Sequence, residues 1–171
     1  MTKIVVGVCG SVAAVRVPEL VRELVRQGIE VECAMSENAW NIIHGNVLEW
    51  SSGKPVISEI TGAVEHVRLC GLEGEASVLL VCPATSNTIS KVACGIDDTV
   101  ITTLAATALA SKTKIIVVPA MHQSMYENPF VKENIGKLRK AGVVFVEPKI
   151  EEGKAKLPSE EDIIKAVKSV L

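Results

Sequence analysis

Short polar side chains follow an apolar run near the middle of the chain. The segment Ala76–Cys82 is almost wholly apolar, and Pro-Ala-Thr-Ser-Asn-Thr follows it at positions 83–88. A buried strand that ends this way presents hydroxyl, amide and backbone N–H groups at the carboxyl edge of a sheet, where open α/β folds bind ligands. Similar junctions occur at positions 5–13 and 117–125. Three such strand ends converging on one crevice predict a bound cofactor.

The first of these junctions predicts a phosphate site. Positions 7–13 read Gly-x-x-Gly-Ser-x-Ala where a strand passes into a helix. The free N–H groups of a helix N-terminus attract anions, Gly10 permits close approach, and Ser11 either donates to a phosphate oxygen or only caps the helix. The spacing departs from Gly-x-Gly-x-x-Gly, so a dinucleotide is not favoured. Ser36 and Asn38, after the second apolar run, are interpreted either as a cap and turn or as a second phosphate contact.

The histidines differ in their placement. An imidazole titrates near neutral pH and can act as an acid or base in a closed site. His122 follows the fourth apolar run, so it falls at the same predicted sheet edge as positions 83–88. His66 lies between two turn-rich segments, where a purely structural histidine is the alternative. His44 is interpreted as a residue at the end of a helix.

Strand-like and helix-like segments alternate along the chain. The predicted strands are 3–8, 29–35, 76–82, 114–118 and 143–146. The predicted helices are 12–27, 37–44, 86–94, 98–110, 129–141 and 160–170. Continuous apolar strands separated by helices predict an α/β fold with a doubly wound parallel sheet, Rossmann-like or flavodoxin-like, in a single domain over residues 1–171. Positions 147–158 are predicted to form a polar loop.

Composition excludes several classes of protein. The 171 residues are 48% hydrophobic, with a net charge of −2 and no basic cluster, which disfavours a nucleic-acid partner. The first apolar run is too short for a signal peptide or a membrane span. The five cysteines are scattered without a Cys-x-x-Cys pair, which argues against a metal site or a disulfide framework. We therefore expect a cytoplasmic protein without a membrane partner.

Over essentially its whole length the chain resembles the flavin-dependent cysteine decarboxylase family. The resemblance rests on Gly-Ser-Val-Ala-Ala at 10–14, Glu65-His66, the run at 83–88, and Pro-Ala-Met-His-Gln-Ser-Met-Tyr at 119–126. The likeness is strongest to the decarboxylase half of archaeal bifunctional coenzyme A enzymes, whose cysteine-ligating half has no counterpart here. It implies FMN-dependent decarboxylation of phosphopantothenoylcysteine to phosphopantetheine, in which oxidation of the thiol-bearing carbon makes a thioaldehyde that accepts the electrons left by carbon dioxide.

The resemblance also implies roles for individual residues. The phosphate of FMN would be held by Gly10, Ser11, Val12, Ser36 and Asn38. The ribityl chain and the ring would be held by Thr85, Ser86, Asn87, Thr88 and Ala120. His66 would be the catalytic acid–base residue, and His122, Met125 and Lys154 would bind the substrate.

Two departures from the family pattern leave alternatives open. His122 stands where the family usually has an asparagine that holds the substrate carboxylate. The flap stretch Gly153–Leu157 lacks the cysteine that protonates the enethiol intermediate, so another group donates that proton, the reaction stops at the enethiol, or the flavin chemistry differs. The alternative function is an FMN-binding electron-transfer protein or reductase of the same fold, such as the archaeal flavoproteins or dihydromethanopterin reductases, which would not need a base at His66.

The expected assembly is a homo-oligomer. Aromatic residues make up 3% of the chain, too few to cover a flavin within one subunit, so a neighbouring subunit is expected to complete the pocket. The resemblance implies a trimer or a multiple of three. The exact substrate, the proton donor and a separate synthetase partner stay open.

Overall fold

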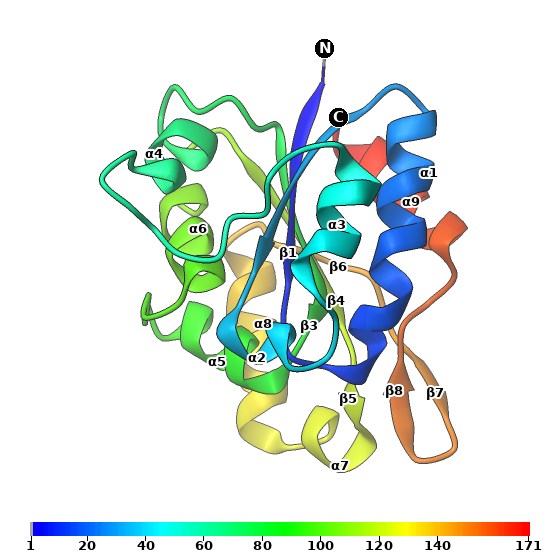
Figure 1. Cartoon of the computed structure of the whole chain (residues 1–171). Coiled ribbons are helices and arrows are strands. Elements are labelled where there is room, and N and C mark those ends of the chain that lie inside the picture. The colour runs from blue at the N-terminus through cyan, green and yellow to red at the C-terminus, as the bar shows by residue number, and fades with distance from the viewer. Residues whose placement is uncertain (1) are drawn as a thin grey trace.

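A five-stranded sheet forms the centre of the computed structural model, which describes residues 2–171 (Figure 1). Its strands are β1 (Lys3–Val8), β2 (Glu30–Met35), β3 (Val78–Ala84), β4 (Lys114–Pro119) and β6 (Val144–Phe145). Their order is β2-β1-β3-β4-β6, and every neighbouring pair is parallel. This is the flavodoxin-like arrangement of a doubly wound sheet, which confirms the predicted fold class.

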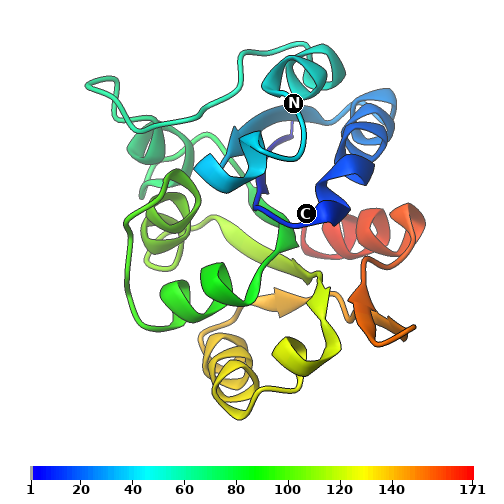
Figure 2. The same cartoon turned by 60° about the horizontal axis from the view of Figure 1, so that its bottom comes forward.

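Helices cover both faces of this sheet (Figures 1 and 2). They are η1 (Val12–Arg16), α1 (Val17–Arg26), α2 (Glu37–Trp40), α3 (Gly45–Ser52), α4 (Glu65–Cys70), α5 (Ser86–Ala93), α6 (Val100–Ala108), α7 (Gln123–Tyr126), α8 (Pro129–Lys140) and α9 (Glu160–Val170). Side chains of α1, α3 and α9 join one hydrophobic core, and those of α4, α5, α6 and α8 join the other. Successive residues of a strand point to opposite faces, so Ile4 and Val6 enter the first core while Val5 enters the second.

Three predicted segments differ from the structure. The predicted helix 12–27 is divided into the 3₁₀ helix η1 and the α-helix α1, whose first turn contains Pro18. The predicted helix 37–44 ends at Trp40, and His44 instead caps the start of α3, which was not predicted. The hydrogen-bond pattern also makes residues 65–70, which include His66, a short helix.

The prediction of a polar loop at 147–158 was wrong. Strands β7 (Lys149–Glu151) and β8 (Lys154–Lys156) form an antiparallel hairpin, and β8 also pairs with β5 (Met121–His122). The two turn residues, Glu152 and Gly153, both have positive φ angles, 51° and 68°. Such angles at both positions are typical of the tight turn whose twist matches the flanking strands.

The start of β1 and the end of α9 lie at the top of the molecule in Figure 1, while β5, α7 and the hairpin lie at the bottom. The carboxyl ends of β1, β3 and β4 point toward that lower edge. None of the helices within residues 2–171 is long and apolar enough to cross a membrane.

Candidate functional site

A cavity of about 540 Å³ lies at the carboxyl ends of β1, β3 and β4. Strand order reverses between β1 and β3, because β1 is followed along the chain by β2 on one side while β3 lies on the other. Ligands of open α/β sheets bind at such a switch point. Nine of the predicted site residues line this cavity: Gly10, Ser11, Val12, Thr85, Ser86, Ala120, His122, Met125 and Lys154.

The residues after β1 and β3 each begin a helix at the cavity. The side chain of Ser11 accepts a hydrogen bond from the backbone N–H of Ala13 at 3.4 Å, and Thr85 accepts one from the N–H of Thr88 at 3.3 Å. Each hydroxyl thus satisfies one of the free N–H groups at its helix start. The remaining free N–H groups give this end of the cavity a partial positive charge that suits an anion.

Gly10 allows the loop after β1 to pack against α2. A Cβ atom at this position would lie 2.5 Å from Cβ of Asn38, closer than any side chain tolerates. Asn38 therefore lies beside the predicted phosphate loop, although neither Asn38 nor Ser36 lines the cavity. Ser36 makes no side-chain cap to α2, contrary to the prediction, and its backbone N–H donates to the Val8 carbonyl at 3.0 Å.

Asn87 and Thr88 also lie outside the lining of the cavity. Asn87 is exposed on α5, whereas Thr88 is buried. The Thr88 hydroxyl accepts a hydrogen bond from that of Thr85 at 3.2 Å. The structure thus places Thr88 behind Thr85, where it orients the threonine that does line the cavity.

The hairpin β7–β8 forms one wall of the cavity. His122 lies opposite Lys154 in the pairing of β5 with β8, and the backbone N–H of Gln123 donates to the Gly153 carbonyl at 2.9 Å. The ammonium of Lys156 is paired with Glu151 at 3.6 Å and with Glu152 at 2.6 Å. Lys154 has no ion pair within residues 2–171, so its charge is available to a ligand.

Arg16 is a residue of the cavity that sequence reasoning missed. Its two terminal nitrogens donate to the carbonyls of Leu157 and Pro158, both at 3.2 Å. These bonds join η1, which follows the predicted phosphate loop, to the end of the hairpin. The sequence carries no signal for this contact, because its partners are backbone atoms 141 and 142 positions away.

The structure does not bring His66 to the cavity of its own chain. His66 lies on α4, and Figure 1 shows α4 and the hairpin on opposite sides of the molecule. Its ring atom Nδ1 is buried and has no hydrogen-bond partner within residues 2–171. A buried polar atom is nearly always hydrogen-bonded in a native structure, so this nitrogen is an exception within residues 2–171.

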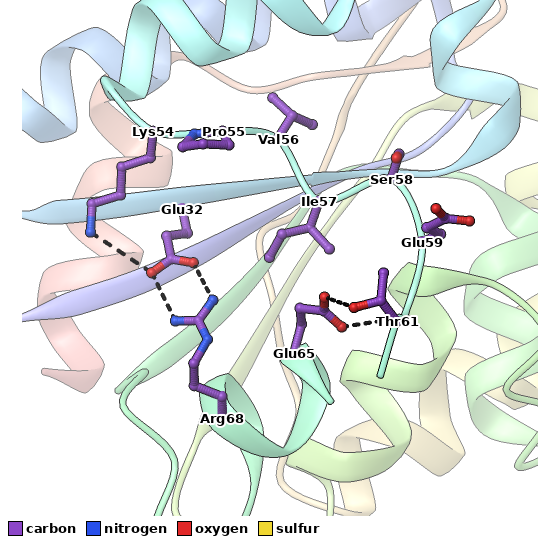
Figure 3. Close-up of a pocket in the computed structure, with 10 residues that line it drawn as sticks. All are labelled: Glu32, Lys54, Pro55, Val56, Ile57, Ser58, Glu59, Thr61, Glu65 and Arg68. Carbon is purple, nitrogen blue, oxygen red and sulfur yellow. Dashed lines mark hydrogen bonds and ion pairs between the residues drawn. The ribbon is translucent and has the colours of Figure 1, made fainter. Parts of the chain in front are cut away.

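A cluster of charges beside β2 fixes the helix that carries His66. Glu32 accepts hydrogen bonds from Arg68 of α4 and lies 3.8 Å from Lys54 (Figure 3). It also accepts a hydrogen bond from Lys3 of β1. Burial disfavours the Glu32 carboxylate, but the bonds from Arg68 and Lys3 outweigh it and lower its pKa to about 2. A second cavity of about 430 Å³ lies beside this cluster.

Thiols and metal ligands are not part of the site. Cys9, Cys33, Cys70 and Cys82 are buried, and burial raises the pKa of the Cys9 thiol to about 11. None of the five cysteines lines the cavity at the strand ends. No group of three or more potential metal ligands occurs within residues 2–171.

The fold and the cavity together define an α/β protein that binds a ligand at the switch point of a doubly wound sheet. The model of the family described as flavoprotein matches residues 1–171, and the chain belongs to this family. Its membership in the flavin-dependent cysteine decarboxylase group, predicted from the motifs, is confirmed by the following relatives and structures.

The coenzyme A biosynthesis bifunctional protein CoaBC of Thermococcus kodakarensis is 57% identical over 163 residues, which cover 95% of this chain and 40% of that protein. CoaBC of Methanocaldococcus jannaschii is 42% identical over 166 residues, covering 96% and 40%. The chain therefore spans about 40% of the length of these relatives. The FMN-dependent cysteine decarboxylase SpaF superposes with a TM-score of 0.81 at 29% identity, covering 98% of both chains. The peptidyl-cysteine decarboxylase EpiD superposes with a TM-score of 0.84 at 27% identity, covering 98% of this chain and 99% of EpiD.

Proposed function

We propose that this protein binds FMN at the strand ends and decarboxylates phosphopantothenoylcysteine to phosphopantetheine. The observation that carries the proposal is the convergence of nine predicted residues on one cavity at the sheet's switch point. The relatives support the pathway, because the sequence matches CoaBC proteins of coenzyme A biosynthesis. The solved structures support the reaction, because SpaF and EpiD are cysteine decarboxylases of the same fold.

The residues of the cavity fit FMN in both size and chemistry. Its volume of about 540 Å³ falls within the range of about 300–1,000 Å³ that small-molecule sites occupy. The helix starts at Ser11 and Ser86 offer backbone N–H groups to a phosphate and to ribityl oxygens. Ala120, Met121 and Leu157 offer an apolar surface to a flat ring. The sequence has no dinucleotide-binding fingerprint, so we expect a cofactor with a single phosphate group, as in FMN.

The residues that line the cavity then have distinct roles. FMN, when bound, supplies reversible two-electron oxidation at the thiol-bearing carbon of the substrate. Ser11 and the N–H groups of η1 hold its phosphate, and Thr85 with Ser86 orients its polar edge. The imidazole of His122 donates a hydrogen bond to the substrate carboxylate, and Lys154 meets the phosphate of the substrate as a point charge. The hairpin wall excludes water from the reacting atoms.

The proposal includes a homo-oligomer, a trimer or a multiple of three, in which His66 serves the cavity of a neighbouring subunit. Two observations support this arrangement. His66 lies on α4, outside the cavity of its own chain, and Val64 and Val67 on either side of it are half-exposed, at 49% and 50%. Exposed apolar side chains beside the predicted catalytic residue suit a surface that another copy covers.

The decisive experiment follows carbon dioxide and product mass together. Purified protein should release FMN, not FAD, on acid denaturation, and it should convert phosphopantothenoylcysteine to phosphopantetheine with one carbon dioxide per product. A flavinated protein that releases no carbon dioxide but accepts electrons from a reductase would support the electron-transfer alternative. Release of carbon dioxide from a cysteine-terminated peptide, but not from phosphopantothenoylcysteine, would support the proposed decarboxylation and contradict the proposed substrate.

A further inference from the structure

The residue two positions before His66 has a strained backbone. Val64 has a φ of 48° and a ψ of 49°, in the left-handed region. A branched side chain is rarely found there, because its carbon atoms crowd the backbone. Within residues 2–171 Glu152 is the other non-glycine residue with a positive φ, and the tight turn of the hairpin accounts for it. Strain of this kind persists only where the surrounding structure enforces it, and it clusters at functional sites.

Val64 gains little within its own chain from this conformation. Its side chain is 49% exposed, so packing does not offset the strain. It occupies the cap position of α4, where residues usually have extended backbone, and its side chain makes no hydrogen bond to the helix. Glycine or asparagine would adopt the same angles more easily. Local stability therefore does not explain the backbone of Val64.

A turn closed by Thr61 and Glu65 holds Val64 in this conformation (Figure 3). The Glu65 carboxylate accepts hydrogen bonds from the backbone N–H of Thr61, at 2.8 Å, and from the Thr61 hydroxyl. That hydroxyl accepts a bond from the N–H of Ala63 at 3.1 Å, and the N–H of Val64 donates to the Thr61 carbonyl at 3.0 Å. The bonds from Thr61 also lower the pKa of Glu65. Together these hydrogen bonds leave the chain little freedom at Val64.

The conformation of Val64 sets the direction of α4 and therefore the position of His66. The Val64 carbonyl accepts from the N–H groups of Val67 at 2.9 Å and Arg68 at 3.1 Å, so the first turn of α4 is built on Val64. The other end of the helix is held by the bonds of Arg68 to Glu32. A change of φ at Val64 would rotate the first turn, which contains His66.

We propose that the turn of residues 61–65 is a positioning device, which keeps Val64 left-handed so that α4 presents His66 to the cavity of the neighbouring subunit. This inference rests on the proposed function, in which His66 is the acid–base residue. Such a residue must lie within hydrogen-bond reach of the proton it moves, and a misplacement of about 1 Å can lower a rate about 10²-fold. None of residues 61–65 lines the strand-end cavity of its own chain, so the turn acts on the reaction through His66.

Glu65→Ala opens the turn and provides the main test. Val64 is then free to relax to a negative φ, and we expect the kcat of carbon dioxide release to fall at least about tenfold, a change of about 1.4 kcal/mol. The KM for the substrate and the affinity for FMN should stay at their parent values. Glu65→Gln is the matched control, because its amide oxygen still accepts from the Thr61 N–H and its amide nitrogen donates to the Thr61 hydroxyl. This control should keep most of the activity.

A second substitution tests the backbone directly. Glycine adopts positive φ about as readily as negative φ, so Glu65→Ala combined with Val64→Gly should recover a kcat within about threefold of the parent. Val64→Gly alone should stay within the same factor, because the intact turn still selects the left-handed form. If Val64 only stabilised the fold, removing its side chain would instead add to the loss caused by Glu65→Ala.

The strain has a readout that does not depend on activity. Val64→Gly should be more stable than Val64→Ala, by about two- to fivefold in the folding equilibrium constant, because alanine retains most of the left-handed penalty. The order should reverse at Val67, which is half-exposed within α4, because alanine is the better helix former there. Denaturant unfolding of these variants at one protein concentration measures both differences.

The possible failures are distinguishable. If the parent releases no carbon dioxide, the proposed function is wrong. If the parent is active and Glu65→Ala keeps the parent kcat, the turn does not position His66, and the inference is overturned while the function stands. A large loss in Val64→Gly alone, or no recovery in the double variant, would show that the backbone angle is not what matters and would also overturn it. Greater stability of Val64→Ala than of Val64→Gly would contradict the strain.

Discussion

Arg68 donates hydrogen bonds to both carboxylate oxygens of Glu32, at 3.2 and 2.8 Å. This pair joins α4, which carries His66, to β2, the edge strand of the sheet (Figure 3). The side chain of Glu32 is 10% exposed and that of Arg68 is 39% exposed. The pair is therefore better shielded from solvent than a surface ion pair, whose contribution to stability is usually small.

Glu32→Gln should destabilise the protein by about 1–3 kcal/mol, because it leaves the cations Arg68 and Lys3 without their partly buried negative partner. The pKa of Glu32 is lowered from its ordinary value of 4.5 to about 2. Its contribution is thus fully present above pH 4.5 and is lost as pH falls toward 2. Denaturant unfolding at several pH values should show the gap between parent and variant closing over this range. Glu23→Gln, at an exposed pair, is the control, and an equal effect of both variants would contradict the assignment.

Gly10→Ala should weaken FMN binding by at least about tenfold, a loss of about 1.4 kcal/mol. The added Cβ meets Asn38 at 2.5 Å, so the loop after β1 must move away from α2. Fluorescence titration of cofactor-free protein with FMN measures the effect. Gly136→Ala is the control, because nothing lies within 4 Å of the added atom, and helix propensity favours alanine there by about 1 kcal/mol. Equal FMN affinity in both variants would contradict this role of Gly10.

His66→Asn should retain the fold and FMN while carbon dioxide release falls about 10²–10⁴-fold, the usual contribution of a general acid or base. Circular dichroism and flavin absorbance test the first part, and trapped carbon dioxide tests the second. Turnover at the parent rate would show that His66 is not the base and would favour an electron carrier.

Assembly provides an independent test. Light scattering should give a mass of three chains or a multiple of three. Hybrids of His66→Asn with a variant that has lost FMN binding should regain activity, because some cavities then combine an intact FMN site with an intact His66. A flavinated monomer with full activity would contradict the shared site.

Arg16→Ala should loosen the hairpin β7–β8. Two hydrogen bonds to the carbonyls of Leu157 and Pro158 are lost, and a net loss of about 1 kcal/mol increases the open population about fivefold. Limited trypsin digestion followed by mass spectrometry should show faster cleavage after Lys154. Arg26→Ala, which removes an exposed pair on α1, should leave that rate unchanged.

The sequence was sufficient to predict the sheet and its ligand edge. The central strands are continuous apolar runs, and β1 has the predicted bounds Lys3–Val8. The three strand ends singled out by their Gly, Ser, Thr and Ala residues do meet at one cavity. These features depend on the local pattern of apolar and polar residues and on the topology that this pattern allows, so they can be predicted from a single sequence.

The features that could not be predicted depend on contacts distant in sequence or on unusual backbone angles. The hairpin was missed because its turn is Glu152–Gly153, and a glutamate at positive φ is uncommon. Helix α3 was missed because Gly45, Asn46 and Trp50 are poor helix formers; its amphipathic face is held by packing on α1. The separation of His66 from the cavity follows from where α4 packs, which no local pattern specifies.

The position of the chain ends has a practical consequence for handling the protein. The start of β1 and the end of α9 lie at the edge of the molecule remote from β5, α7 and the hairpin (Figure 1). A tether attached at either end would hold the protein on a sensor surface with the mouth of the cavity facing the flowing solution. Ligand arrival could then be timed on a fixed molecule, with neither the tether nor the support obstructing entry.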